Sequence, residues 1–405
     1  MYLTTLDKLG RFFLAGSGIL IELKKGGPHM KEKIGLYVHI PFCQKLCHYC
    51  DFLTFENQEG MIEDYVDYLI KEMDLYQDRG YLLYTIYFGG GTPSYLAADE
   101  MAEIMDAIQK KFEWTPDCEV SIEMNPESID AEKVKTYLEC GFNRFSMGVQ
   151  TFDPKVLQIM GRLHTRDTVL SKYTLLREMG CDNISIDLMF NNPGQDIDVL
   201  NRDIDQALAL NPDHISYYSL MIKDNTNFKR WLEKGRIRLF DEKTDRDMYH
   251  LIQSRLQEAG FDQYEISSFA RNGKQGRHNK KYWQLDNYLG LGLGASSNID
   301  LVRFTNTRGF NDYFAAIDQG QVPVETSEQM DIEEREKEFI MLNMRLRQGF
   351  DISTINQRFG IDFLSKYQTA LDKHLKYKVI QIQGDRISFT DYGMDVGNQF
   401  YLDIL

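Results

Sequence analysis

Short apolar runs alternate with amphipathic stretches along the chain between residues 30 and 300. Six of these runs are rich in β-branched and aromatic residues, which predicts strands at 35–40, 85–88, 119–124, 144–149, 183–189 and 214–220. Between them, hydrophobic positions recur at helical spacing, as in residues 61–77 and in residues 196–210, where Asp196 is a candidate N-cap. Repeated strand–helix units predict an α/β fold with a parallel sheet and right-handed crossovers.

Six such units are too few to close an eight-stranded barrel, so we expect an open, three-quarter parallel β/α barrel. From residue 301 to residue 405 the pattern changes to helices and a short strand pair at 379–383 and 386–389, which predicts a smaller C-terminal α+β domain. We therefore expect a core over residues 30–300 and a second domain over residues 301–405. Open parallel sheets carry their chemistry at the carboxyl ends of the strands.

The first 29 residues do not fit this pattern. Their apolar run at 12–21 follows two basic residues and is too short to cross a bilayer as a helix. A clear cleavage site of a signal peptide does not follow it. Residues 24–27, Lys-Lys-Gly-Gly, are what a purine-rich ribosome-binding site would encode. We therefore interpret residues 1–29 as an upstream extension and Met30 as the native start.

The composition narrows the classes of function. The chain has 405 residues, 43% of them hydrophobic, which supports folded domains and argues against disorder. Its net charge of −15, from 46 basic and 61 acidic residues, disfavours nucleic acid as a partner because phosphate contacts need a basic surface. The sequence contains no apolar run of transmembrane length. Six cysteines without a disulfide-like framework favour a reducing, cytoplasmic location.

Three of the six cysteines form the most specific motif of the chain, Cys43-x3-Cys47-x2-Cys50. A structural zinc site uses four protein ligands. A [4Fe–4S] cluster held by only three thiolates leaves one iron open to an outside ligand. Position 51 is Asp and position 52 is Phe, so this local run contains no fourth cysteine. A zinc site completed by a distant histidine, and three unrelated buried thiols, stay open as alternatives at this point.

Glycines and polar residues lie at the edge where the carboxyl ends of the predicted strands meet. The Gly-Gly-Gly of residues 89–91 follows the second strand and lets the backbone approach a ligand closely. Glu123 and Asn125 close the third strand, and Gln150 ends the fourth. Asp187 lies inside the fifth strand, where a charge is costly unless something pairs with it. This edge is therefore the candidate binding site for a cofactor.

These motifs resemble the oxygen-independent coproporphyrinogen oxidases and their relatives in the radical S-adenosylmethionine (SAM) superfamily, from residue 34 to the C-terminus. The shared elements are His-Ile-Pro-Phe-Cys at 39–43, Gly-Gly-Gly-Thr-Pro-Ser at 89–94, Gly-Val-Gln-Thr-Phe at 148–152 and Ile-Asp-Leu-Met at 186–189. The resemblance implies a [4Fe–4S] cluster on Cys43, Cys47 and Cys50. It also implies SAM contacts by Tyr37, Gly90, Gly91, Thr92, Glu123, Gln150, Arg162 and Asp187. One departure is Phe-Asn-Asn-Pro at 190–193, where relatives usually have Tyr-Gly-Leu-Pro.

Two branches of this family bear on function. The oxidases typically carry a further cysteine two positions after the third ligand, where this chain has Phe52, and a long N-terminal segment that is short here. The HemW-type haem chaperone branch resembles the chain more closely, because His-Asn-Lys-Lys-Tyr-Trp at 278–283 matches a segment proposed there to take part in haem binding. This resemblance implies His278 as an axial haem ligand, since a neutral imidazole is a usual one. An ordinary surface histidine is the alternative.

The resulting hypothesis is a haem chaperone that binds haem and transfers it to an unidentified acceptor protein, with the cluster and SAM supporting or regulating the transfer. The alternative is an oxygen-independent coproporphyrinogen III oxidase, which would use a SAM-derived radical to decarboxylate propionates. Whether the chain is an enzyme stays open between these two. An exposed apolar patch on the C-terminal domain could pair two copies into a homodimer.

Overall fold

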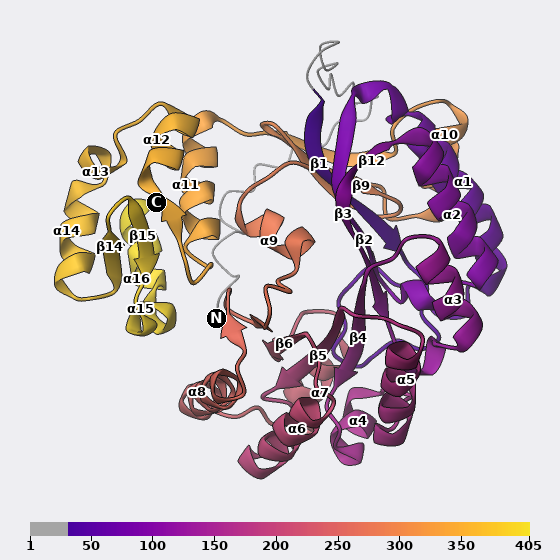
Figure 1. Ribbon diagram of the computed structural model, residues 1–405, viewed down its shortest axis with the longest axis horizontal. Helices are drawn as coiled ribbons and strands as arrows, with labels where there is room; N and C mark the ends of the chain where they lie inside the picture. The colour runs from indigo at the N-terminus through magenta and orange to yellow at the C-terminus, as the bar shows by residue number, and fades with distance from the viewer. Residues whose placement is uncertain (1–30) are drawn as a thin grey trace.

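The computed structural model describes residues 31–405, so the interpretation of residues 1–29 and of Met30 concerns a segment outside the described residues. Six parallel strands form the centre of the large domain (Figure 1): β1 Glu32–Ile40, β2 Tyr81–Gly90, β3 Glu113–Met124, β4 Arg144–Gln150, β5 Ile184–Phe190 and β6 His214–Ser219. From β1 to β6, each strand is hydrogen-bonded in parallel to the next strand in the sequence. The six predicted strands are therefore confirmed.

Helices cover the convex face of this sheet (Figure 1): α1 Ile62–Asp74, α2 Ala98–Lys111, α3 Ala131–Glu139, α4 Pro154–Met160, α5 Arg166–Glu178 and α6 Ile197–Ala209. In α1 the buried residues Ile62, Val66 and Leu69 recur at helical spacing and face the sheet. Asp196 caps α6 as predicted, because its side chain accepts a hydrogen bond from the N–H of Val199 at 2.9 Å. The open α/β barrel predicted from the sequence is confirmed.

Further strands extend the sheet at both edges, giving the order β12-β11-β10-β9-β1-β2-β3-β4-β5-β6-β8-β7. They are β7 Asp262–Gln263, β8 Ser268–Ala270, β9 Tyr288–Leu291, β10 Ser296–Ile299, β11 Val302–Asn306 and β12 Val324–Gln329. β9 is parallel to β1, and the pairs beyond it and beyond β6 are antiparallel. β11, β12 and the intervening α10 (Phe310–Asp318) belong to the large domain, so the change of domain falls near residue 330 rather than at 301.

The second domain has a hydrophobic core of its own, in which Phe339, Phe363 and Ile387 are buried. Its helices are α11 Ile332–Asn343, α12 Ile352–Phe359, α13 Phe363–Lys366, α14 Gln368–Lys376, α15 Asp391–Val396 and α16 Asn398–Ile404. They pack with a three-stranded sheet in the order β13 (Phe350–Asp351), β15 (Arg386–Phe389), β14 (Ile380–Gln383). The predicted strand pair and the α+β class of this domain are confirmed.

Three helices follow β6 in the chain: α7 Asn227–Glu233, α8 Glu242–Glu258 and α9 Arg277–Trp283. Figure 1 shows α9 on the concave side of the sheet, between the parallel strands and the C-terminal domain. It packs against β2 on one side and against α11 on the other. The His-Asn-Lys-Lys-Tyr-Trp segment therefore lies inside the open barrel.

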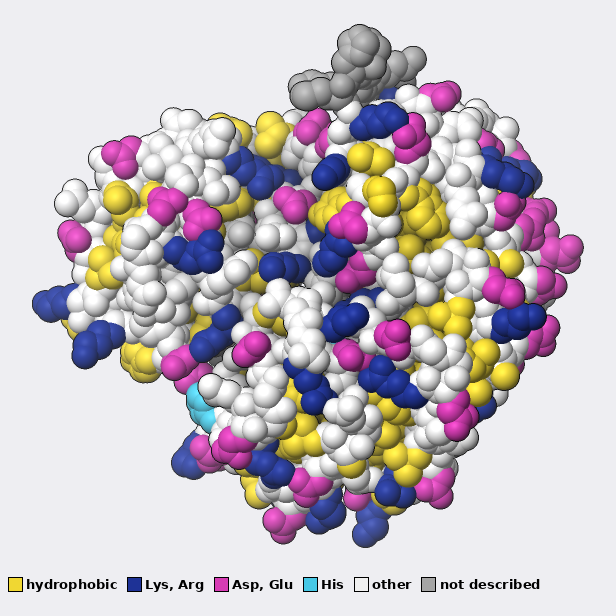
Figure 2. Space-filling view, in the orientation of Figure 1, with side chains coloured by type: hydrophobic (Ala, Val, Ile, Leu, Met, Phe, Trp, Pro, Cys, Tyr) yellow, Lys and Arg dark blue, Asp and Glu magenta, His cyan; other side chains and the backbone are white. Residues whose placement is uncertain are grey.

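The surface of the molecule is mixed in character. On the face shown in Figure 2, Lys and Arg side chains are interspersed with Asp and Glu and with apolar side chains. Between residues 31 and 405, no helix is both long and apolar enough to cross a bilayer.

Candidate functional site

The three motif cysteines lie in the loop that follows β1, at the carboxyl end of the parallel strands. The N–H of Cys43 donates to Phe55 O at 2.9 Å, and the N–H of His48 donates to Met160 O at 2.9 Å, so both ends of the loop are fixed. Burial, with the charges of neighbouring cysteines, raises the pKa of Cys43 to about 11 and that of Cys50 to about 12. A bound metal would supply the positive charge that these thiols need in order to ionise.

A single zinc ion and a [4Fe–4S] cluster place different demands on the positions of three cysteine ligands. Among residues 31–405, no three His, Cys, Asp or Glu side chains converge as ligands for one ion. A [4Fe–4S] cluster binds each thiolate through a different iron, so its ligands lie farther apart than those of one zinc ion. The zinc alternative therefore finds no support in the described residues, and the cluster on Cys43, Cys47 and Cys50 stays the prediction.

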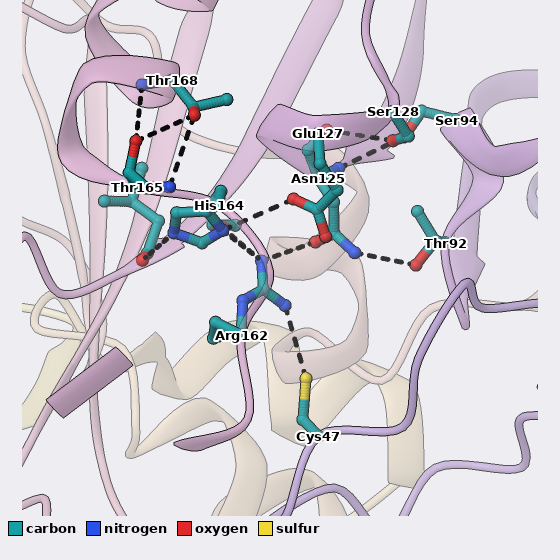
Figure 3. A network of polar contacts seen from close by, with 12 residues as sticks. Cys47, Thr92, Ser94, Asn125, Glu127, Ser128, Arg162, His164, Thr165 and Thr168 are labelled. Carbon is teal, nitrogen blue, oxygen red and sulfur yellow. Dashed lines mark hydrogen bonds and ion pairs between the residues drawn. The ribbon is translucent and has the colours of Figure 1, made fainter. Parts of the chain in front are cut away.

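An arginine lies beside the middle cysteine (Figure 3). Arg162 follows α4, and its Nη1 donates toward Cys47 Sγ at 3.6 Å. Its Nη2 donates to Asn125 Oδ1 at 2.8 Å and to Gly148 O at 2.6 Å. Its Nε is buried and has no hydrogen-bond partner in the described part of the chain. Because a buried cationic donor is costly without an acceptor, this group indicates an acceptor that arrives with a ligand.

Asn125 connects this arginine to Thr92 (Figure 3), and Thr92 lies beside the first cysteine. The Nδ2 of Asn125 donates to Thr92 Oγ1 at 2.9 Å, and that hydroxyl lies 3.3 Å from Cys43 Sγ. Two of the three motif cysteines are thus in contact with one series of polar side chains. The sequence places Asn125 with Glu123 at the end of a predicted strand and so at the candidate edge, but the family resemblance did not include it among the SAM contacts.

Two residues that the sequence did not indicate complete this arrangement. His164 Nδ1 lies 3.4 Å from Glu127 Oε2, and His164 Nε2 lies 3.1 Å from Val149 O. Burial raises the pKa of Glu127, but the His164 contact and the charge of Arg162 outweigh it, so the net pKa is lowered. We define the arginine network as Thr92, Asn125, Glu127, Arg162 and His164. Four of its members, all except His164, line a pocket together with Cys47.

Two half-buried carboxyl groups, those of Glu123 and Asp187, lie on the strands next to this network. Glu123 accepts a hydrogen bond from Tyr87 OH at 2.6 Å, and Asp187 accepts one from Ser146 Oγ at 2.7 Å. Burial, with the charge of Asp187, raises the pKa of Glu123 to about 7. Burial also raises the pKa of Asp187. Two interacting carboxyl groups that are partly desolvated stabilise a cation bound near them, because the cation offsets both the desolvation and the repulsion between them.

Glycines bring the segment after β2 against the cysteine loop. A Cβ on Gly91 would lie 3.1 Å from Cys43 Sγ, and one on Gly90 would lie 2.6 Å from the ring of His39. Gly90 also has a φ of +112°, which residues with a side chain rarely adopt. The same His39 ring lies 2.9 Å from Tyr37 OH through Nδ1. Tyr37, Gly90 and Gly91 are therefore brought to the edge that carries the cysteines.

The ends of β4 and β5 have unusual backbone conformations. Gln150 has a φ of 65° and Asn191 a φ of 62°, both in the left-handed region that non-glycine residues seldom occupy. Asn191 Nδ2 donates to Asp245 Oδ1 and Asn192 Nδ2 to Met189 O, each at 2.9 Å. The segment that departs from the relatives' usual sequence is thus hydrogen-bonded within the protein itself.

His278 lies in surroundings that differ from those expected of a haem ligand. The residue is 1% exposed, with Nδ1 2.9 Å from Thr85 Oγ1 and Nε2 2.8 Å from Tyr282 OH. Burial lowers its pKa well below the usual value, so the ring is neutral. Neither ring nitrogen can bind haem iron unless one of these hydrogen bonds breaks. The burial of His278 contradicts the surface alternative, while the axial-ligand role stays a prediction that requires one of these hydrogen bonds to break.

Comparison with known proteins places the fold and the site in a class. Residues 37–207 match the family model of the Radical SAM superfamily, and residues 330–396 match that of the HemN C-terminal domain. The structure of coproporphyrinogen III oxidase (HemN) from Escherichia coli, a radical SAM enzyme, superposes with a TM-score of 0.81 at 22% identity, covering 92% of this chain and 90% of that chain. The molecule therefore has the radical SAM fold with a HemN-type C-terminal domain.

Curated relatives narrow the class further. The heme chaperone HemW of Bacillus subtilis (strain 168) is 33% identical over 368 residues, which cover 90% of this chain and 97% of the relative. HemW of Escherichia coli (strain K12) is 33% identical over 323 residues, which cover 77% of this chain and 82% of the relative. The chain belongs to the HemW family, which confirms the resemblance found in its motifs. Membership of the radical SAM superfamily implies a [4Fe–4S] cluster and SAM.

Proposed function

We propose that this protein is a haem chaperone, which binds haem and transfers it to an acceptor protein. The observation that carries the proposal is 33% identity to a protein named as a heme chaperone, over 97% of that relative's length. Phe52 supports the chaperone over the oxidase, because it stands where the oxidases typically carry a further cysteine. It is 69% exposed at the cysteine loop.

In this proposal Cys43, Cys47 and Cys50 hold a [4Fe–4S] cluster. Their shared loop supports it, as do the Arg162 and Thr92 donors beside two of the three sulfurs. Hydrogen bonds to the sulfurs tune the reduction potential of a cluster. Three protein ligands leave one iron available to SAM.

We propose that SAM binds beside the cluster at the carboxyl ends of the parallel strands, where Arg162 reaches Cys47. The partnerless Nε of Arg162 suits the carboxylate of SAM, and the half-buried carboxyl groups of Glu123 and Asp187 suit its cationic and hydroxyl groups. The remaining contacts in the proposal are Tyr37, Gly90, Gly91, Thr92 and Gln150. Bound SAM supplies radical chemistry, while the protein positions it and excludes water.

A haem titration of anoxically reconstituted protein tests the chaperone function. We expect a saturable Soret band, and transfer of that haem when apomyoglobin is added as a probe acceptor. A parallel sample with coproporphyrinogen III, SAM and reductant should yield no protoporphyrinogen IX. Formation of protoporphyrinogen IX would identify an oxidase instead, and haem absorbance that does not saturate would refute specific haem binding.

Two further proposals concern the surroundings of the protein. None of the six cysteines, all within the described residues, forms a disulfide, and thiolate ligands of a cluster need a reducing environment, so we propose a cytoplasmic location. The C-terminal domain exposes Leu375, Tyr377 and Leu402, and pairing of two copies through such residues stays a prediction. Size-exclusion chromatography with light scattering tests it, and a mass of one chain at all concentrations would contradict it.

A further inference from the structure

The start of α9 is attached to the strand that carries Glu123. Glu119 on β3 accepts hydrogen bonds from the N–H of Arg277 at 3.1 Å and from the N–H of His278 at 2.9 Å. Each of its carboxylate oxygens serves one donor, and the residue is buried. These bonds satisfy two of the N–H groups that a helix start leaves without intrahelical partners, and a negative charge is favourable there. The helix is thus fixed to β3 four residues before Glu123.

The imidazole of His278 reaches from this anchor to β2. Its ring stacks on the ring of Tyr87, with centroids 5.0 Å apart and planes inclined by 24°. Thr85, which binds Nδ1, lies two residues before Tyr87 and so on the same face of the strand. Tyr282, one turn further along α9, binds Nε2. The imidazole is therefore held in one orientation against Tyr87.

Tyr87 connects the imidazole to the proposed SAM site. Its hydroxyl donates to Glu123 Oε1 at 2.6 Å, and its ring stacks on that of Tyr37 with centroids 6.3 Å apart. Gly89 leaves room for this group, because a Cβ there would lie 3.0 Å from the Tyr87 ring and 3.2 Å from Glu123 Oε2. An unbroken series of contacts thus runs from α9 to Glu123. We define the aromatic stack as Tyr87, His278 and Tyr282.

We propose that His278 is a positioning residue for SAM: it holds Tyr87, and Tyr87 holds the carboxyl group of Glu123 toward the ligand. The inference rests on the proposed function, since Glu123 acts on SAM only if SAM binds there. It assigns the first part of the His-Asn-Lys-Lys-Tyr-Trp segment to the SAM site rather than to haem iron. An axial ligand needs a free ring nitrogen, whereas a positioning residue uses both nitrogens as the structure has them.

SAM binding to reconstituted wild-type and variant proteins tests this role, by calorimetry and by the SAM-induced change in the electron paramagnetic resonance of the reduced cluster. Tyr87→Phe keeps the ring but removes the bond to Glu123, and we expect the Kd for SAM to rise about tenfold. His278→Ala should have a similar effect, while His278→Phe keeps a flat ring and should recover part of the affinity. Tyr84→Phe is the matched control, since its hydroxyl, on the same strand, lies 3.4 Å from Asp286.

The double variant Tyr87→Phe/His278→Ala should bind SAM about as weakly as the weaker single variant, because both residues act through Glu123. Phenylalanine cannot bind iron, so the Soret band of His278→Phe should match that of the wild type only if His278 is not the haem ligand, as we propose. Wild-type SAM affinity in Tyr87→Phe overturns the inference, even if His278→Ala does not fold. Loss of the Soret band in His278→Phe with SAM binding intact also overturns it and leaves the proposed function standing. A wild-type protein that does not bind SAM refutes both.

Discussion

The arginine network and the aromatic stack differ in charge and in the completeness of their hydrogen bonding. The arginine network beside the cysteines is charged, and Arg162 Nε has no partner among the described residues. The aromatic stack at α9 is neutral, and both nitrogens of His278 and the hydroxyl of Tyr87 are hydrogen-bonded. One assembly lacks an acceptor, whereas the other is satisfied without a ligand.

This difference indicates which assembly receives a ligand and which one supports it. A buried polar group without a partner costs free energy that a ligand can recover. A satisfied group has little to gain from a ligand and instead fixes its neighbours in place. On this basis we expect ligand affinity to depend on charge in the arginine network and on packing in the aromatic stack.

The largest effect should come from removing a cluster ligand. Cys47→Ala leaves two thiolates and takes the sulfur acceptor from Arg162. We expect complete loss of the cluster's visible absorbance and paramagnetic signal, with iron content at background after anoxic reconstitution. Cys181→Ala, a buried thiol outside the motif, is the control and should keep the cluster. A full cluster in Cys47→Ala would contradict the ligand assignment.

Replacing the fork of the arginine by a single ammonium should have the next largest effect. Arg162→Lys keeps the charge, but a single ammonium group cannot donate to Asn125 and Gly148 and also to a bound ligand. Loss of a hydrogen bond to a charged group costs about 2 kcal/mol, so we expect the Kd for SAM to rise about thirtyfold. Arg166→Lys, where the arginine contacts Gln206 and Asp167 near the surface, should bind SAM normally. Equal affinities in the two variants would show that Arg162 does not contact SAM.

The parallel strands were predictable because strands buried on both faces are continuous apolar runs. The strands at the edges of the sheet were not predictable in this way. β12 (Val324–Gln329) has mostly exposed polar residues, so neither alternation nor an apolar run marks it. The first half of β3 is polar and contains Pro116, which explains why the sequence predicted its start at 119 instead of Glu113. The domain boundary was placed at 301 because these short strands were not recognised.

The charged and glycine-rich parts of the site were predictable from residue type and position at strand ends. The environment of His278 was not predictable, because its neighbours Arg277, Lys280 and Lys281 suggest a surface segment. Its burial depends on Glu119, which is 159 positions away and accepts the backbone N–H of His278. A contact of that range has no local signal in the sequence.

Glu123 should make SAM binding depend on pH. Burial raises its pKa to about 7, so the carboxylate that attracts a cation is progressively protonated as the pH falls from 8 to 6. We expect affinity for SAM to fall about tenfold over this range. The amino group of SAM titrates in a neighbouring pH range. The quantity to compare is therefore the difference in SAM affinity between the wild type and Glu123→Gln at each pH. Parallel pH profiles of the two proteins would show that Glu123 does not titrate in the ligand-free site.

Lys281 lies on α9 beside the aromatic stack, but unlike the members of that stack it lacks a hydrogen-bond partner among the described residues. It is 0% exposed, and its Nζ has no hydrogen-bond partner between residues 31 and 405. The rings of Tyr282 and Tyr288 lie 4.1 and 4.2 Å away, which favours a cation, but burial lowers its pKa well below 10.5. Because an ammonium needs acceptors that are missing here, we infer that the amine is neutral in the folded protein.

The smallest effect should therefore be a gain in stability on replacing this lysine. A lysine that is neutral when folded and charged when unfolded releases a proton on folding, so its cost decreases as the pH rises toward 10.5 and grows as the pH falls toward the lowered pKa of the folded protein. Lys281→Met should raise the free energy of unfolding at pH 7 by about 1–3 kcal/mol. Wild-type stability should also increase more steeply between pH 7 and about 9.5 than that of the variant. Lys280→Met, where Nζ donates to Gln275 Oε1 at 2.9 Å, should not be stabilised. A Lys281→Met protein that melts earlier than the wild type at pH 7 would show that the ammonium form, held by the two rings, is the native one.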